Sequence, residues 1–248
     1  MGANIFTAIN VYSTITGHPF IDIPVWVWVS LLIAGLLFVP FFAYHRIRTK
    51  LNGILLAVPN IELYGSPYVD TRSIYSVTKV KGQFPLIGTP FFAHIIFCNN
   101  PQVRSIATTA ESIDTEITFF DDEEKPVLSP IFGRWEGTPQ PATLSPFASI
   151  RELLKIGLEP TGLPRELDIA LKYPEDEFCY AFNNESCRHS NDWRMPKFLL
   201  KGYSFYVKVR LVGVPMLDKT WWFTLYNSGA GKGLRIETTN PLMHVVKG

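Results

Sequence analysis

The chain has 248 residues, of which 47% are hydrophobic and 18% charged, and its formal net charge at pH 7 is +1. A strong nucleic-acid binder needs clustered cations to neutralise phosphates, so this near-neutral balance argues against that class of protein. The length is enough for a membrane anchor followed by one substantial hydrophobic core.

The most distinctive segment is residues 23–44, a run of 22 residues without a charge. A helix rises about 1.5 Å per residue, so this run would span roughly 30 Å, the thickness of a bilayer's hydrocarbon core. Trp26, Trp28 and Tyr44 lie near its two ends, where amphipathic rings favour the lipid headgroups. We therefore predict a retained transmembrane helix, because the run is too long for a signal peptide and lacks a small-residue cleavage site.

Basic residues follow this helix and none precedes it. Arg46, Arg48 and Lys50 come directly after the apolar run, whereas its N-terminal side carries only Asp22. The positive-inside rule then predicts a single-pass protein of the cell membrane, with its N-terminus outside and its C-terminal domain in the cytoplasm. Residues 1–22 are predicted to form an outer arm, either an interfacial helix or a partner-binding segment, and residues 45–60 a basic juxtamembrane linker.

Residues 61–248 have the character of a β domain. Short segments rich in Val, Ile and aromatic residues alternate with Gly, Pro and Asn turns, and Tyr203–Val212 alternates apolar and polar residues. This pattern predicts an antiparallel β-sandwich with one short helical insertion at Ser149–Gly157. The predicted strands are Ile74–Lys79, Phe91–Phe97, Asp114–Phe120, Leu167–Tyr173, Tyr203–Val212, Trp221–Tyr226 and Leu234–Thr238.

The segments FFAHIIFCNNP, GRW and KFLLKGYSFYVKVRLVG carry a family pattern of strand edges and turn residues. Over roughly Phe91–Glu237 the chain resembles uncharacterised bacterial and archaeal membrane-anchored proteins that carry an immunoglobulin-like β-sandwich. The resemblance implies a mainly β fold behind a membrane helix and implies no shared activity. The residues that match the pattern, none of them implied to be catalytic, are Asn99, Gly133, Arg134, Trp135 and Asn227.

No segment has the spacing of a known catalytic or metal site. The glycines of Gly229–Gly233 resemble a phosphate loop, but the flanking strands predict a hairpin turn instead. His94 and Cys98 lie four apart on one strand, on the same face but too far apart for proton transfer. Cys179 and Cys187 are too widely spaced for a zinc pair, and three irregular cysteines fit a reducing compartment. We predict a protein that is not an enzyme and that has no cofactor and no metal.

The tryptophans offer a candidate interaction surface, made of Trp193, Arg194, Trp221 and Trp222. Trp and Arg are enriched at interface hot spots. Trp221 and Trp222 are adjacent on one strand, so one must fill the core while the other faces outward. For Trp193 the plainest interpretation is a loop that packs the ring onto the sandwich.

These features together predict a membrane-anchored binding or accessory protein, a scaffold or adaptor that presents a cytoplasmic β-sandwich. Its predicted partners are membrane lipid and either a protein partner or a second copy of the chain, and not nucleic acid. The alternative is a ligand-sensing membrane effector that oligomerises through its transmembrane helix, where Ser30, Ala34 and Gly35 form a small-residue face.

Overall fold

The structure is a computed structural model that describes residues 24–75, 80–83, 85–101, 108–138, 155–160, 162–189, 192–215 and 218–239. The chain divides into two compact units, Met1–Gly53 and Ile54–Gly248. The predicted outer arm, residues 1–22, lies outside the described residues, as does most of the predicted helix at Ser149–Gly157.

The apolar run forms the helix α2, Val25–Ala57, whose 33 residues would extend for about 50 Å. It continues without a break through Arg46, Arg48 and Lys50, so these residues belong to the helix and not to a separate linker. Arg and Lys are good helix formers, which explains the extension, and the helix ends just before Pro59. Pro40 lies inside the helix without ending it.

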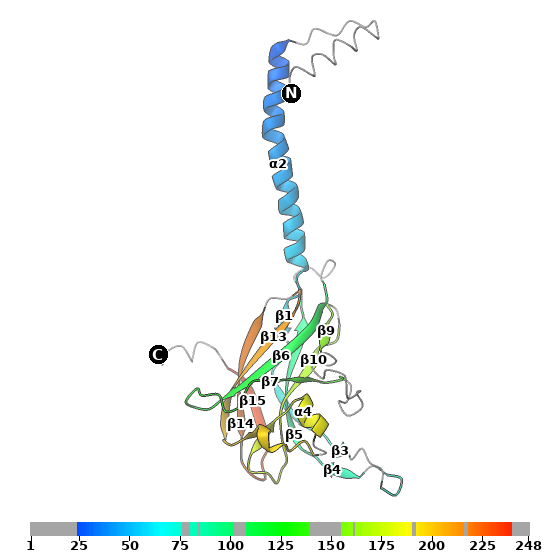
Figure 1. The fold of residues 1–248 in the computed structure, drawn as a ribbon, viewed down its shortest axis with the longest axis vertical. Helices are drawn as coiled ribbons and strands as arrows, with labels where there is room; N and C mark the ends of the chain where they lie inside the picture. The colour runs from blue at the N-terminus through cyan, green and yellow to red at the C-terminus, as the bar shows by residue number, and fades with distance from the viewer. Residues whose placement is uncertain are drawn as a thin grey trace. The chain divides into compact units, whose positions relative to one another are not determined.

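Two antiparallel sheets make up most of the second unit (Figure 1). The first has the order β1 (Ile61–Leu63), β5 (Phe91–Asn99), β10 (Arg165–Lys172), β11 (Cys179–Ala181) and β12 (Leu199–Leu200), with β2 (Tyr68–Thr71) also on β5 and β8 (Arg134–Trp135) on β10. The second has the order β15 (Leu234–Thr238), β14 (Lys219–Asn227), β13 (Ser204–Val214), β6 (Ala110–Phe120) and β7 (Ile131–Phe132), with β9 (Ile156–Leu158) on β6. A small hairpin joins β3 (Ile74–Tyr75) and β4 (Leu86–Gly88).

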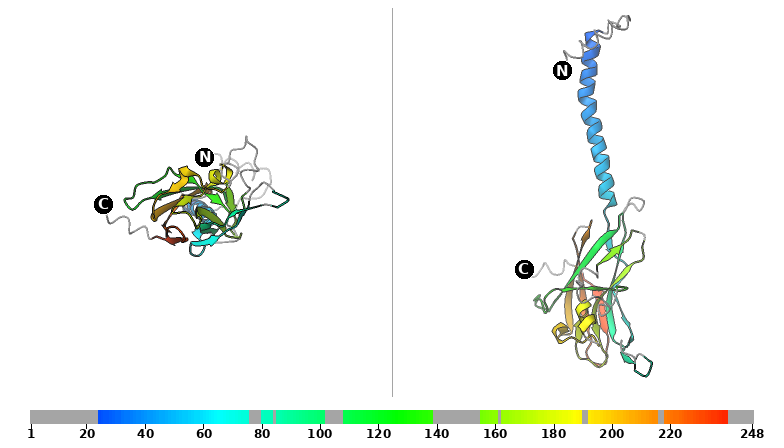
Figure 2. Two further views of the ribbon diagram at one scale, coloured as in Figure 1. Left: turned by 90° about the horizontal axis from the view of Figure 1, so that it is seen from below. Right: turned by 45° about the vertical axis from the view of Figure 1, so that its right-hand side comes forward.

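One hydrophobic core joins the inner faces of the two sheets. In β13 the alternating residues Phe205, Val207 and Val209 are buried, as period-two alternation requires for a strand with one face inward. They share one cluster with Ile95 and Phe97 of β5 in the first sheet. The strands β5, β10, β6 and β13 are labelled in Figure 1, and Figure 2 shows the same ribbon in two further views. The predicted order, a long apolar helix followed by a mainly antiparallel β region, is confirmed.

The helical insertion predicted at Ser149–Gly157 is wrong where the structure describes it. Ile156 and Gly157 lie in β9, and Ile156 pairs with Ile113 of β6 and packs on the core. The open edge of β6 supplies backbone partners there, so tertiary pairing overrides the local helical pattern. The structure describes a short α-helix further along the chain, α4, Asn184–His189, which is too short for a periodic pattern to reveal.

The residues of the family pattern hold the strand ends together. The Asn99 amide accepts a hydrogen bond from the backbone N–H of Asn60 and donates to the carbonyls of Thr108 and Leu158. Asn227 likewise donates to two backbone carbonyls, those of Glu177 and Gly202, at 2.9 and 3.1 Å. Buried backbone groups need such partners, which explains asparagine at both positions without a catalytic role.

Packing explains the remaining pattern residues. Gly133 faces the core so closely that a Cβ there would lie 2.8 Å from Cδ1 of Leu167 and 2.9 Å from Cδ1 of Ile117. Trp135 is 1% exposed and packs edge-on against Phe97. These two residues of the pattern therefore contribute to close packing of the core between the two sheets.

Candidate functional site

The densest group of interacting charges lies on the outer face of the first sheet. The central strand β5 pairs with β2 on one side and β10 on the other, and the register sets both Tyr68 and Asp168 opposite His94. His94 is 0% exposed, and its Nε2 lies 2.8 Å from Asp70 Oδ1 while its Nδ1 lies 2.9 Å from Asp168 Oδ1. The Tyr68 ring covers the imidazole at a centroid distance of 5.0 Å.

This geometry holds His94 in its charged form. A carboxylate can only accept a hydrogen bond, so each ring nitrogen must carry a proton to bond its partner. Burial alone would lower the pKa of His94, but the hydrogen bonds and charges of Asp168 and Asp70 outweigh it and raise that pKa. The pKa of Asp70 is lowered for the matching reason, since the bond to His94 outweighs the cost of burial.

Arg72, the residue directly after β2, extends the cluster. Its guanidinium contacts four carboxylates: Asp70 at 3.3 Å, Glu136 at 3.3 Å, Glu166 at 2.9 Å and Asp168 at 3.7 Å. Burial raises the pKa of Glu136, helped by a hydrogen bond with Glu166, whereas the pKa of Glu166 is lowered by hydrogen bonds from Tyr68, Glu136 and Arg72 that outweigh its burial.

The cluster is arranged as an ion-pair network and not as an acid–base site. A general base needs a free lone pair, and both ring nitrogens of His94 are used by carboxylates. Burial, together with the nearby charge of Glu62, raises the pKa of the Cys98 thiol and disfavours the thiolate nucleophile. Within the described parts of the chain, no group of three or more His, Cys, Asp or Glu side chains is placed to hold a metal ion.

The network predicts a specific dependence of stability on alkaline pH. Because the folded-state pKa of His94 lies above its unfolded value of about 6.5, its contribution is complete below that pH and disappears as pH rises through the folded-state pKa. We expect the difference in free energy of unfolding between wild type and His94→Gln to shrink steadily above neutral pH. Denaturant unfolding from pH 6 to 10 measures this. The variant His45→Gln, on the exposed surface of α2, should follow the wild-type profile, and a pH-independent difference for His94→Gln would contradict the prediction.

The four residues of the predicted interaction surface lie in two separate places. Trp193 packs against Phe92 and Phe182, with ring centroids 5.8 and 5.2 Å away. Arg194 stacks its guanidinium 3.8 Å from the centre of the Tyr173 ring and forms ion pairs with Glu175, Asp176 and Asp192. Both residues therefore lie in a loop that packs beside the first sheet.

Trp221 and Trp222 lie on β14 of the second sheet and face opposite ways. Trp221 packs against the core, 4.9 Å from the Phe97 ring. Trp222 lies on the outer face beside Phe120, at 5.6 Å, and under Lys208, whose Nζ lies 5.8 Å from its ring centre. We call Phe120, Lys208 and Trp222 the outer aromatic patch. The strand register, which sets Lys208 opposite Trp222, creates this patch, and sequence reasoning found only its tryptophan.

The predicted anchor residues all lie on α2. Trp26, Trp28 and Tyr44 are 69%, 40% and 63% exposed, and the basic residues Arg46, Arg48 and Lys50 are exposed as well. By length and composition the helix Trp26–Ala57 could cross a membrane, and none of its most apolar window of 18 residues is buried.

The glycine-rich segment forms a turn between β14 and β15, as its flanks indicated. Gly229 and Gly231 adopt φ values of 83° and 75°, which glycine reaches without strain. The buried Lys172 donates to the backbone carbonyls of Gly229 and Lys232, so the turn is fixed by a lysine from β10.

No protein-family model matches the chain, and no curated protein matches it. Among solved structures, the archaeal flagellum of Methanospirillum hungatei strain JF1 aligns with 93% of this chain and 97% of its own, at 11% sequence identity and a TM-score of 0.33. Those values are too low to support an argument about fold or function.

Proposed function

We propose that this chain is a membrane-anchored binding protein, an accessory or adaptor subunit without catalytic activity. One observation carries the proposal: the helix Trp26–Ala57 contains an apolar window of 18 residues, none of which is buried within the protein. A helix that is apolar on all sides is stable in lipid or against other apolar helices.

The proposed orientation places the β unit in the cytoplasm. Arg46, Arg48 and Lys50 follow the apolar run, which favours a cytoplasmic position for that end of the helix. The three cysteines form no disulfide, and Cys179 is fully buried as a thiol, which suits a reducing compartment. The two antiparallel sheets over one core also suit the immunoglobulin-like architecture that the family pattern implies.

The proposed docking site is the outer aromatic patch of the second sheet. Trp222 is half-buried and stacks beside Phe120, and Lys208 adds a cation over the ring. Interface hot spots combine such aromatic anchors with basic groups. Arg210 lies on the same outer face and is paired with Asp218, so the patch itself carries the positive charge of Lys208 and suits an acidic protein partner.

The proposal predicts that Trp222→Thr weakens partner capture by roughly tenfold or more, the effect of losing an aromatic hot spot. The full chain is isolated in mild detergent with a limiting amount of bait, and co-purifying proteins are quantified by mass spectrometry. Tyr226→Thr, four residues along the same strand and the same outer face, is the matched control and should retain the partner. Unchanged capture by Trp222→Thr, or a particle mass that corresponds to copies of this chain alone, would contradict an accessory role at this patch.

A further inference from the structure

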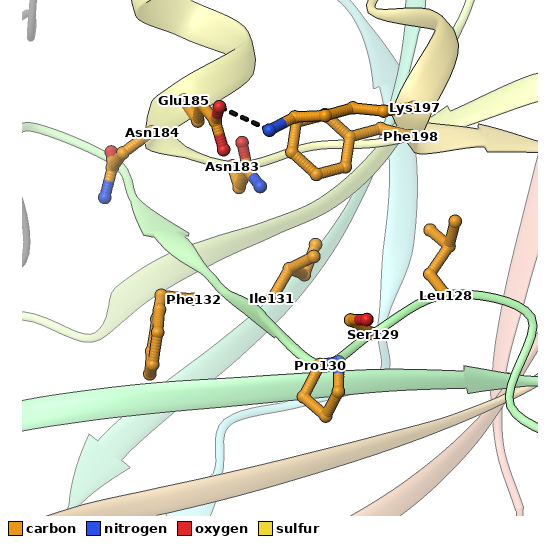
Figure 3. A pocket seen from close by; sticks show the side chains of 10 residues that line it. All are labelled: Leu128, Ser129, Pro130, Ile131, Phe132, Asn183, Asn184, Glu185, Lys197 and Phe198. Atoms are coloured by element: carbon orange, nitrogen blue, oxygen red, sulfur yellow. Dashed lines mark hydrogen bonds and ion pairs between the residues drawn. The ribbon is translucent and has the colours of Figure 1, made fainter.

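A crevice of about 740 Å³ opens between β7 and the segment that contains α4 and the 3-10 helix η3, Pro196–Phe198 (Figure 3). The strand β7 is the edge of the second sheet, and η3 leads directly into β12, the edge of the first. The apolar wall consists of Leu128, Ile131, Phe132 and Phe198. This volume falls in the range of small-molecule binding sites, which combine apolar walls with a few placed polar groups.

Asn183 supplies the most informative polar group of the crevice. Asn183 is 5% exposed. Its Oδ1 accepts hydrogen bonds from the backbone N–H of Ser186 at 2.8 Å and from the Ser186 hydroxyl at 2.9 Å. A backbone N–H can only donate, so the oxygen must face Ser186 and the amide NH2 must point the other way.

The NH2 group of Asn183 is turned into the crevice in Figure 3, toward the side on which Ile131 and Leu128 lie. Among the residues that the structure describes, no group accepts a hydrogen bond from this nitrogen. Because this nitrogen opens on the crevice, water can accept its hydrogen bond in the free protein, and a bound molecule that displaces this water has to supply an acceptor in its place. The donor therefore marks where a ligand acceptor would bind.

The neighbouring groups define which acceptor fits. Asn184 is also buried, and its Oδ1 accepts from Nη1 of Arg134 at 3.0 Å, which again leaves its NH2 as the group without a partner in the described chain. At the rim Lys197 pairs with Glu185, as the dashed line in Figure 3 marks. Because this pair neutralises itself, the crevice offers hydrogen-bond donors without a net charge.

We propose that this crevice binds a small uncharged molecule with an apolar body and a carbonyl group. The apolar body would lie against Ile131 and Phe198, and the carbonyl oxygen would accept the hydrogen bond from Asn183 Nδ2. A carboxylate is disfavoured because the Lys197–Glu185 pair leaves no net positive charge at the rim to offset the loss of its hydration, and a hydrocarbon without an acceptor would leave the Asn183 donor unsatisfied. This site goes beyond the proposed function and depends neither on the membrane anchor nor on the outer aromatic patch.

The test uses the full chain in lipid nanodiscs and fluorine NMR of three probes of similar size. 4-Fluoroacetophenone carries the neutral carbonyl, 4-fluoroethylbenzene lacks it, and 4-fluorobenzoate is charged. We expect saturable binding of the ketone with a Kd at least tenfold lower than that of either other probe. No saturable binding, or equal affinity for the ketone and the hydrocarbon, would overturn the proposal.

Asn183→Asp is the decisive variant because it keeps an oxygen for the Ser186 cap and replaces the NH2 donor with a charged oxygen that can only accept. Ketone affinity should fall at least tenfold, while the circular dichroism spectrum and melting temperature stay near wild type. Asn183→Ser, which also caps helices and lacks the NH2 group, replaces it if the aspartate variant does not fold. Asn52→Asp, exposed on α2, controls for the change of charge and should bind the ketone as wild type does. Wild-type ketone affinity in a folded Asn183 variant would assign the binding to another part of the chain and overturn the proposal.

Discussion

Replacing Asp168 with alanine is expected to lower the free energy of unfolding by about 3–5 kcal/mol, the usual cost of removing one partner from a buried ion pair. Asp168 is 4% exposed and accepts the hydrogen bond from Nδ1 of His94, which is itself 0% exposed. The substitution leaves a buried imidazolium with only one carboxylate and takes an anion from beside Arg72. Denaturant unfolding of the full chain in detergent at pH 7 measures the loss.

Two further variants separate the ion pair from general damage. Asp218→Ala breaks an exposed pair with Arg210 and should leave the free energy of unfolding nearly unchanged, because exposed ion pairs contribute little. The double variant His94→Leu with Asp168→Ala removes the cation as well, so it should be more stable than the sum of the two single losses indicates. Strict additivity of the two substitutions would show that the pair is not coupled.

The partners of His94 could not be predicted from the sequence. The sequence correctly placed this histidine within a predicted strand, Phe91–Phe97. Its two carboxylates, however, come from positions 24 and 74 residues away in the chain. Only the strand register brings them together, and Asp70 lies in a strand of four residues that shows no alternation. Local periodicity predicts which face is buried, but it does not predict which distant strand pairs beside it.

The same limit separates the tryptophans. Trp193 and Arg194 were grouped with Trp222 in the predicted interaction surface. Aromatic and basic residues occur both in packed loops and at interfaces, so residue type alone does not separate the two. The structure assigns Trp193 to a packed loop against Phe92, whereas the register of β13 and β14 sets Lys208 over Trp222. What the sequence did predict well, the long strands and the apolar helix, depends on patterns within a single element.

The anchor is predicted to depend on the apolar run and not on the whole of α2. Leu32→Arg combined with Leu36→Arg places two charges near the middle of residues 23–44, on side chains that are 64% and 67% exposed. Each arginine at the centre of a membrane helix costs about 2.5–3.5 kcal/mol of insertion free energy, so together they would cost roughly 5–7 kcal/mol. We expect the double variant to leave the membrane fraction, as measured by carbonate extraction of cells that express the full chain.

The matched control uses the same change beyond the predicted span. Leu51→Arg combined with Ile54→Arg adds two charges to exposed positions of the same helix, in the part that follows the basic residues. These positions would lie at or outside the membrane interface, where long basic side chains reach water, so the protein should remain in the membrane fraction. Equal release by both pairs would mean that the membrane contact extends along the entire helix. Retention of both pairs would contradict the prediction, because the apolar run would then not determine whether the protein stays in the membrane.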